Sequence, residues 1–183
     1  MSRHGVVTEP GTIRFERMLP GPIERVWAFL TESDKRAKWL AAGPMELRPG
    51  GRVELRFHHV SLAAAPEATP EPYRRYANGV TNHGRVTRCD PPSLLSFTWD
   101  EGQQEPSEVT FELSPRGSEV LLVLTHRRLA TGPTRLNVAT GWHTHLGILE
   151  AQLSGREAEG FWTTFAARQA EYAQRLEAGS SRS

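Results

Sequence analysis

Six runs of alternating apolar and polar residues, all placed before one long run with helical period, limit the folds open to this chain. Alternation with a period of two is typical of a strand with one buried face. Gly50-Gly51 and Ser114–Gly117 read as tight turns, so the strands are expected to form an antiparallel meander. The predicted strands cover residues 13–19, 52–59, 79–89, 94–99, 108–113 and 119–127.

The helical segments lie between the first two strands and after the last one. Pro22 suits the first turn of a short helix, and Ser33 is expected to cap a second one over 34–40. From Asn137 an apolar stripe recurs at spacings of four, three and four residues, through Trp142, Leu146, Leu149 and Leu153, and Gly155 ends it. A last helix over 159–177 puts Phe161, Phe165, Tyr172 and Leu176 on one side.

An amphipathic helix and a one-sided sheet bury their apolar faces against each other. The order of elements therefore predicts an α+β helix-grip fold, in which a curved antiparallel sheet wraps around the helix that carries Trp142. With 183 residues, of which 38% are hydrophobic, the chain is long enough for one core. We expect a single domain over 12–177, made of a core over 12–155 and an additional helix over 159–177, with flexible tails at 1–11 and 178–183.

Four segments of the chain resemble a known family. They are Pro22–Thr31 with Ala37–Leu40, Gly50–Phe57, Gly84–Trp99 and Gly141–Gly155. In this order they are similar to START-like domains of the type named after the activator of heat-shock-protein-90 ATPase, within the SRPBCC superfamily. The resemblance implies a helix-grip fold with a cavity between helix and sheet, and it implies that the helix pair, with Trp39, borders the cavity mouth. The loop around 61–76 looks longer than usual for the family.

Composition argues against several classes of function. The chain has 22 Lys and Arg against 21 Asp and Glu, a formal net charge of +1, so it lacks the positive field of a nucleic-acid-binding protein. The longest aliphatic run, Val120–Leu124, is far below the ~20 residues that cross a bilayer. The one cysteine, Cys89, excludes an internal disulfide and fits a reducing compartment, so the cytoplasm is the expected location.

The motifs of common enzyme classes are absent from the sequence. It holds no Gly-x-Ser-x-Gly, His-Glu-x-x-His or phosphate-binding loop. His143 and His145 lie two apart on a helix and diverge by ~200°, so they cannot hold one ion together. We expect no metal and no cofactor, and the sequence alone assigns no catalytic residue.

The candidates for ligand contact are large side chains expected to face the space between helix and sheet. His145 flanks the apolar stripe, where it either meets a ligand or is simply hydrogen-bonded at the helix–sheet seam. Trp142 either forms a pocket wall or fills the core. The predicted ligand-binding residues are Trp39, Phe57, Phe97, Phe111, Trp142, His145, Leu146 and Leu149.

Three hypotheses of function follow. The first is a binding module for a small hydrophobic or aromatic ligand in an apolar cavity. The second is a cyclase- or hydrolase-like enzyme that uses His145 or Glu150 as acid or base in the same cavity. The third is a chaperone-associated or stress-response domain that meets a partner through the 61–76 loop or the last helix, which could instead form a homodimer. Arg14, Arg17, Arg52 and Arg56 are assigned to the outer face of the sheet.

Overall fold

The fold is that of a computed structural model, which describes residues 2–62, 64–65, 67–100, 102, 104–130 and 132–180, with side chains up to 175. Its strands are β1 (Val6–Glu9), β2 (Thr12–Pro20), β3 (Arg52–Phe57), β4 (Val80–Asp90), β5 (Leu94–Trp99), β6 (Ser107–Arg116) and β7 (Glu119–Arg127). Its helices are α1 (Ile23–Thr31), α2 (Ser33–Arg36), α3 (Gly132–Leu153) and α4 (Phe161–Ser180), with 3-10 turns η1 (His59–Leu62) and η2 (Glu71–Tyr76).

The seven strands form one antiparallel sheet in the order β1-β2-β7-β6-β5-β4-β3. Register keeps the apolar residues on one face: Phe111 of β6 lies opposite Leu95 of β5 on one side and Leu124 of β7 on the other. All three side chains are buried. The sheet thus has the single dry face that the alternation predicts.

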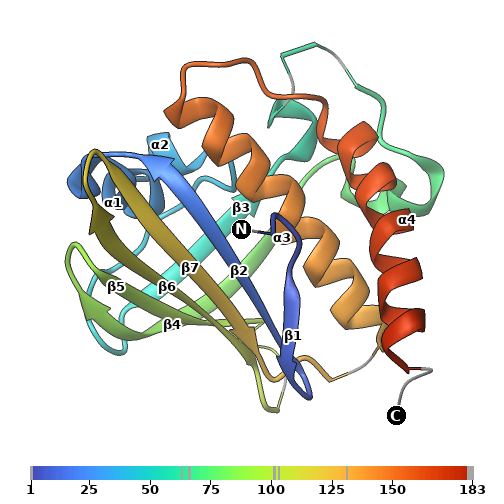
Figure 1. Ribbon diagram of the computed structural model, residues 1–183, viewed down its shortest axis with the longest axis horizontal. Helices are drawn as coiled ribbons and strands as arrows, with labels where there is room; N and C mark the ends of the chain where they lie inside the picture. The colour runs from blue at the N-terminus through green and yellow to red at the C-terminus, as the bar shows by residue number, and fades with distance from the viewer. Residues whose placement is uncertain are drawn as a thin grey trace.

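Helix α3 crosses that dry face, and α4 lies beside α3 (Figure 1). Buried residues of α3, among them Trp142, Leu146 and Leu149, join the strands in one core. The short helices α1 and α2 lie together at one end of the sheet (Figure 1). This arrangement confirms the predicted α+β helix-grip fold. Among the described residues, no helix has the length and apolar character to span a membrane.

The N-terminal segment departs from the prediction of a flexible tail. Val6–Glu9 pairs antiparallel with β2 as an edge strand, and Gly5 donates its N–H to Tyr172 of α4 over 2.6 Å. All four residues of β1 are exposed, so they show no buried face from which a strand could be predicted. At the C-terminal end, the structure does not describe residues 181–183 of the predicted tail. It also does not describe the side chain of Leu176, which the sequence places on the apolar side of the last helix.

Arg17 also departs from its prediction. Residues three apart on a strand face opposite sides, so Arg14 and Arg17 cannot share a face. Arg52 and Arg56 are exposed, as expected for the outer face. Arg17 lies on the inner face with Phe15 and is only 3% exposed.

Two helix boundaries test local predictions. Ser33 does not cap α2; its Oγ accepts a hydrogen bond from the N–H of Gly43 over 2.9 Å instead. Gly155 does follow the end of α3, with a φ of +63° that favours glycine, and the next N–H, of Arg156, bonds back to Ala151.

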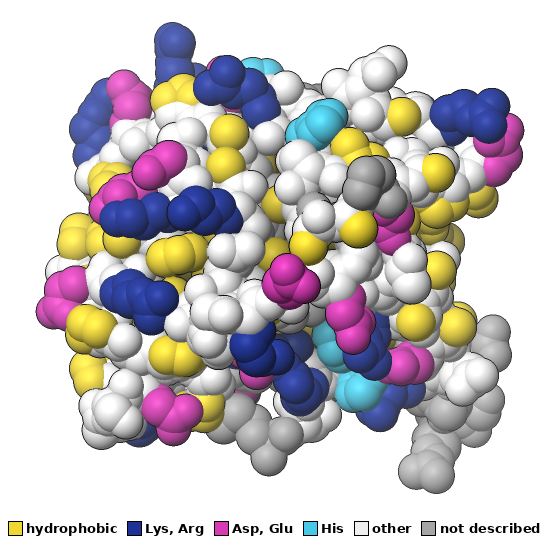
Figure 2. All heavy atoms as spheres, turned by 90° about the horizontal axis from the view of Figure 1, so that it is seen from above, with side chains coloured by type: hydrophobic (Ala, Val, Ile, Leu, Met, Phe, Trp, Pro, Cys, Tyr) yellow, Lys and Arg dark blue, Asp and Glu magenta, His cyan; other side chains and the backbone are white. Residues whose placement is uncertain are grey.

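The surface carries charges of both signs. On the face drawn in Figure 2, basic and acidic side chains lie next to one another, and hydrophobic ones are scattered among them. This mixture agrees with a net charge of +1.

Candidate functional site

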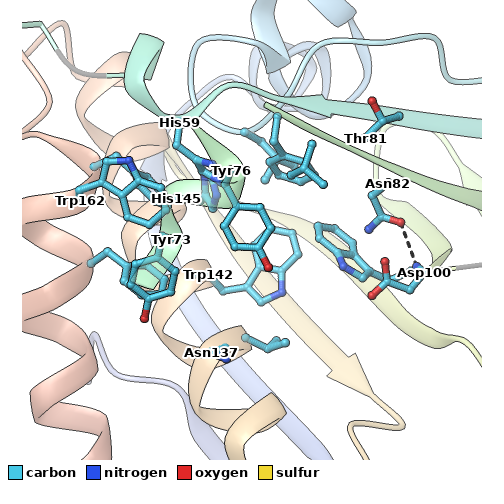
Figure 3. Close-up of a pocket in the computed structure, with 18 of the residues that line it drawn as sticks. His59, Tyr73, Tyr76, Thr81, Asn82, Asp100, Asn137, Trp142, His145 and Trp162 are labelled. Atoms are coloured by element: carbon cyan, nitrogen blue, oxygen red, sulfur yellow. Dashed lines mark hydrogen bonds between the residues drawn. The ribbon is translucent and has the colours of Figure 1, made fainter. Parts of the chain in front are cut away.

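A cavity of about 300 Å³ lies between α3, α4, the η1–η2 segment and one end of the sheet. It is called the aromatic cavity below because rings make up most of its wall. The rings are those of Phe57, His59, Tyr73, Tyr76, Trp99, His126, Trp142, His145, Phe161, Trp162 and Phe165. Figure 3 shows how the labelled side chains come together from strands, helices and the η2 turn.

The rings pack against one another as well as around the space. Tyr73 of η2 stacks on Trp162 of α4, with centroids 5.0 Å apart and planes at 18°. His59 lies 4.5 Å from Phe161 between ring centroids. Trp99 of β5 meets Trp142 of α3 edge to face at 5.4 Å. Such contacts hold the wall in a defined shape.

The loop that carries Tyr73 is tied to α4 by a carboxylate. Glu67 accepts hydrogen bonds from the N–H groups of Trp162 (2.8 Å) and Thr163 (2.6 Å) at the start of α4. An anion there also suits the positive end of the helix dipole. Gln169 of α4 donates to the hydroxyl of Tyr73 over 2.8 Å. The long loop is therefore one wall of the aromatic cavity.

His145 is held in a single tautomer by the backbone. Its Nδ1 lies 2.7 Å from the carbonyl oxygen of Trp39, which can only accept, so Nδ1 carries the proton and Nε2 is a free acceptor. Burial, reinforced by the nearby His59, lowers the pKa of His145 to about 3. The ring is therefore neutral near pH 7 and offers the lone pair of Nε2.

His126 also lines the cavity, but both of its nitrogens are engaged. The indole N–H of Trp142 donates to its Nδ1 over 2.9 Å, so the proton lies on Nε2, which contacts Ser107 Oγ at 2.8 Å. Burial lowers the pKa of His126 to about 3. This histidine positions Trp142 and has no hydrogen-bonding capacity left for a ligand.

Two buried polar atoms of the aromatic cavity's residues have no hydrogen-bond partner. They are Nδ1 of His59 and the indole Nε1 of Trp162. Burial, with a smaller effect of His58, lowers the pKa of His59 to about 4, so its ring is neutral as well. A buried N–H without a partner is unfavourable, and a ligand with an acceptor atom would satisfy it. At the opposite end, the N–H of Asp100 donates to the side chain of Asn82 (Figure 3).

The structure brings three of the eight predicted ligand-binding residues to the cavity: Phe57, Trp142 and His145. Trp39 is fully buried and donates its indole N–H to the carbonyl of Phe29 over 2.7 Å. Phe97, Phe111, Leu146 and Leu149 are also in the core, each at most 2% exposed. Side chains fill the space between helix and sheet around these five residues, and the aromatic cavity lies farther toward α4.

Glu150 does not line the aromatic cavity, where the enzyme hypothesis placed it as an alternative acid or base to His145. Five residues along a helix turn it by ~140° away from His145. Its carboxylate forms ion pairs with Arg3 and, at 4.0 Å, with Arg156. Nor do the described residues include any group of three or more His, Cys, Asp or Glu side chains able to hold a metal ion.

Sequence reasoning missed the contribution of α4 and the long loop. The sequence shows that Phe161 and Phe165 share an apolar side of the last helix, which could form a homodimer. In the structure this side is buried within the chain instead. Trp162 and Tyr73 carried no periodic signal. The aromatic content of 61–76, with Tyr73 and Tyr76, was the one available hint that this loop covers something.

Comparisons with known proteins agree with this fold. A Bordetella parapertussis protein with a solution NMR structure is 48% identical over 94% of this chain and 90% of its own, with a TM-score of 0.79. CalU16 from Micromonospora echinospora is 23% identical, with 93% of each chain covered and a TM-score of 0.63. A conserved protein of unknown function from Enterococcus faecalis is 22% identical over 92% of this chain and 87% of its own, with a TM-score of 0.65.

None of the curated proteins matches the chain. Residues 20–154 match the family described as Activator of Hsp90 ATPase homolog 1-like protein. This range holds α1 to α3 and the strands from β3 to β7, and so most of the helix-grip architecture. The chain therefore belongs to the family of Activator of Hsp90 ATPase homolog 1-like proteins, within the START-like domains.

Proposed function

We propose that this protein binds a small aromatic molecule with one or two hydrogen-bonding groups in the aromatic cavity. The observation that carries the proposal is the wall itself: a hollow of about 300 Å³ whose surface is mostly rings. Pockets for small ligands are concave and mainly apolar, with a few polar groups that orient the ligand. A flat ring system would stack on Trp162 and Trp142 with little loss of conformational entropy.

The polar atoms define the ligand further. Nε2 of His145 calls for a donor, and the indole N–H of Trp162, which is buried in the cavity wall, calls for an acceptor that reaches it when a neighbouring ring shifts. A hydroxyl group supplies both. The ligand class is therefore a phenol-like or hydroxylated aromatic compound.

The geometry favours binding over acid–base catalysis. A pKa of about 3 leaves His145 without a proton to give on Nε2 near neutral pH, and makes it a weak base. Glu150, the other candidate, is ion-paired away from the cavity. The third hypothesis makes the 61–76 loop a contact surface for a protein partner. In the structure, Glu67 and Tyr73 of this loop contact α4 instead.

The test uses 2-naphthol, a hydroxylated bicyclic aromatic, and a glycine that opens onto the cavity. Gly141 lines the aromatic cavity, and a Cβ built on it meets no atom within 4 Å. Gly141→Leu has room for its Cβ, would place a larger apolar side chain in the hollow and would remove a glycine from a helix interior, which favours the helix by about 1 kcal/mol. Calorimetric titration should show saturable binding to the wild type and at least about tenfold weaker binding to this variant.

Gly147 of the same helix supplies the matched control. It also has open space at its Cβ and does not line the aromatic cavity. Gly147→Leu should bind 2-naphthol as the wild type does, and 1-octanol, which has the hydroxyl without the ring, should bind more weakly to both. Equal affinity of Gly141→Leu and wild type for 2-naphthol, or no binding to either, would overturn the proposal.

A further inference from the structure

A second cavity, of about 310 Å³, lies against another face of α3. We name it the basic cavity because four arginines and two histidines line it, against two glutamates. These residues are Arg3, Arg17, Arg156, Arg168, His4, His143, Glu157 and Glu159. Thr144, Gly147 and Ile148 of α3 form much of the remaining wall. It shares no lining residue with the aromatic cavity.

Most of the cations around the basic cavity already have a carboxylate. Glu150 pairs with Arg3 and Arg156, and Glu171 pairs with Arg168 at 2.8 Å and with His4 at 2.8 Å. Arg17 is different. Its Nη1 donates to the carbonyl of Glu16 over 2.8 Å, but its Nε and Nη2 are buried without a hydrogen-bond partner.

A second buried arginine shows what a purely structural guanidinium looks like in this chain. Arg36, 1% exposed, donates to the backbone carbonyls of Leu30, Thr31, Ala41 and Gly43. All three of its nitrogens are used, and it ties α1 and α2 to the segment that follows. Arg17, 3% exposed, has no such set of acceptors. Its guanidinium carbon lies 5.7 Å from the centre of the Phe15 ring, and the charge of Glu150 acts on it, but neither supplies an acceptor to Nε or Nη2. A buried charge that lacks such acceptors is unfavourable unless something else completes it.

The Nε–Nη2 edge of Arg17 is a two-point hydrogen-bond donor. The Nε–H and one Nη2–H of a guanidinium point in the same direction and bind two oxygens of one carboxylate or phosphate side by side. His143 is also at this cavity, and burial, together with Arg17, Arg168 and His4, lowers its pKa to about 3. The positive surroundings that disfavour a protonated histidine favour an anion.

We propose that the basic cavity binds a small oxyanion, a carboxylate or a phosphate group, with the Nε–Nη2 edge of Arg17 as its two-point anchor. The anion reaches this edge when side chains of the cavity wall shift, and Arg3 and Arg156, whose side chains are 62% and 61% exposed, have room to move. This site is separate from the aromatic cavity and does not depend on the function proposed for it.

The experiment measures the melting temperature of the full chain as sodium acetate or sodium phosphate replaces sodium chloride at constant ionic strength. Binding to the native state alone raises the melting temperature in a saturable way. A rise with acetate alone assigns a carboxylate, a rise with phosphate alone assigns a phosphate group, and a rise with both assigns a general oxyanion site.

The variants tie the effect to Arg17. Arg17→Met keeps the apolar stem but removes the edge, so the apparent affinity should fall at least about tenfold. Gly147→Leu fills the cavity and should also weaken binding, whereas Gly141→Leu, in the other cavity, should bind the anion normally. Arg17→Lys keeps the charge without the two-point edge and should restore only part of the affinity.

Three outcomes would overturn the proposal. One is a melting temperature that neither anion raises above its value in chloride. Another is an equal rise in wild type and Arg17→Met. The third is a crystal structure grown in the more effective anion that shows Nε and Nη2 of Arg17 bound to ordered water only.

Discussion

The two cavities lie on different faces of the same helix and are built for different chemistry. His143 and His145 are two residues apart on α3, and the ~200° between them sends one to each cavity. Around His145 the wall is made of rings, and around His143 it is made of arginines with their carboxylate partners. One helix thus separates an apolar compartment from a charged one.

The unpaired polar atoms around the two cavities differ in charge. Both cavities have buried polar atoms without hydrogen-bond partners among their lining residues. These atoms are neutral in one cavity, Trp162 Nε1 and His59 Nδ1, and belong to cations, Arg17 and Arg168, in the other. Unsatisfied groups of this kind are rare in native proteins. Their character therefore indicates what each cavity would bind.

The largest expected effect is on stability in acid. His126, His143 and His145 have a pKa of about 3 in the folded protein, below the ordinary 6.5. Between these values the unfolded chain binds protons that the folded chain does not, so stability falls as pH drops. The free energy of unfolding should be constant above about pH 6.5 and should fall by about 1.4 kcal/mol per pH unit for each such histidine below it.

Denaturant unfolding at several pH values measures this slope, and two variants compare the cavities. Since burial is the main cause of the shift in both places, His143→Gln and His145→Gln should each flatten the slope by a similar amount, about 1.4 kcal/mol per pH unit. A slope that is unchanged in either variant would mean that its histidine is not kept neutral by burial.

The second largest effect is the loss of stability when a side chain in the wall of each cavity is shortened. Trp142 is part of both the core and the aromatic cavity, so Trp142→Ala should lower the free energy of unfolding by about 3–5 kcal/mol and leave Nδ1 of His126 without its donor. Arg168, a half-buried residue of the basic cavity, is paired with Glu171, and Arg168→Ala should change stability by no more than about 1 kcal/mol. Urea unfolding of both variants measures the difference, and comparable losses would contradict it.

The smallest effect is expected at Arg17. Replacing an unpaired buried cation by an apolar side chain of similar length is neutral or stabilising, so Arg17→Met should leave the free energy of unfolding unchanged or raise it by about 1 kcal/mol. Arg36→Met, which strands four carbonyls, should lower it by about 3 kcal/mol or more. Equal losses in the two variants would make Arg17 a structural residue like Arg36.

Most strands could be predicted because the alternation of apolar and polar residues within each one shows which of its faces is buried. Leu94–Trp99 and Glu119–Arg127 have in the structure the bounds that alternation and turns predict. The strand Val6–Glu9 was not predictable, since it is exposed throughout and is held by pairing with β2 and by contacts with α4. The direction of Arg17 was predictable from the period of two, and the assignment to the outer face was wrong on that ground.

The candidate site was harder to predict than the fold. Periodicity says that Phe97, Leu146 and Trp142 face inward, but not which of them meet a filled or an empty part of the core. The cavity exists where α4 and the η2 turn stand off from the sheet, and their position depends on contacts far apart in sequence, such as Glu67 with the start of α4. The apolar periodicity of a single segment contains no information about such a long-range contact.

The most direct test of the central claim, that the aromatic cavity is the ligand site, is an NMR titration of the five tryptophan indole N–H groups with 2-naphthol. Trp99, Trp142 and Trp162 line the cavity, whereas Trp27 and Trp39 do not, and the indole N–H of Trp39 is bonded to Phe29. We expect saturable shifts for the first three signals and none for the other two. Shifts of similar size in all five, or in none, would contradict it.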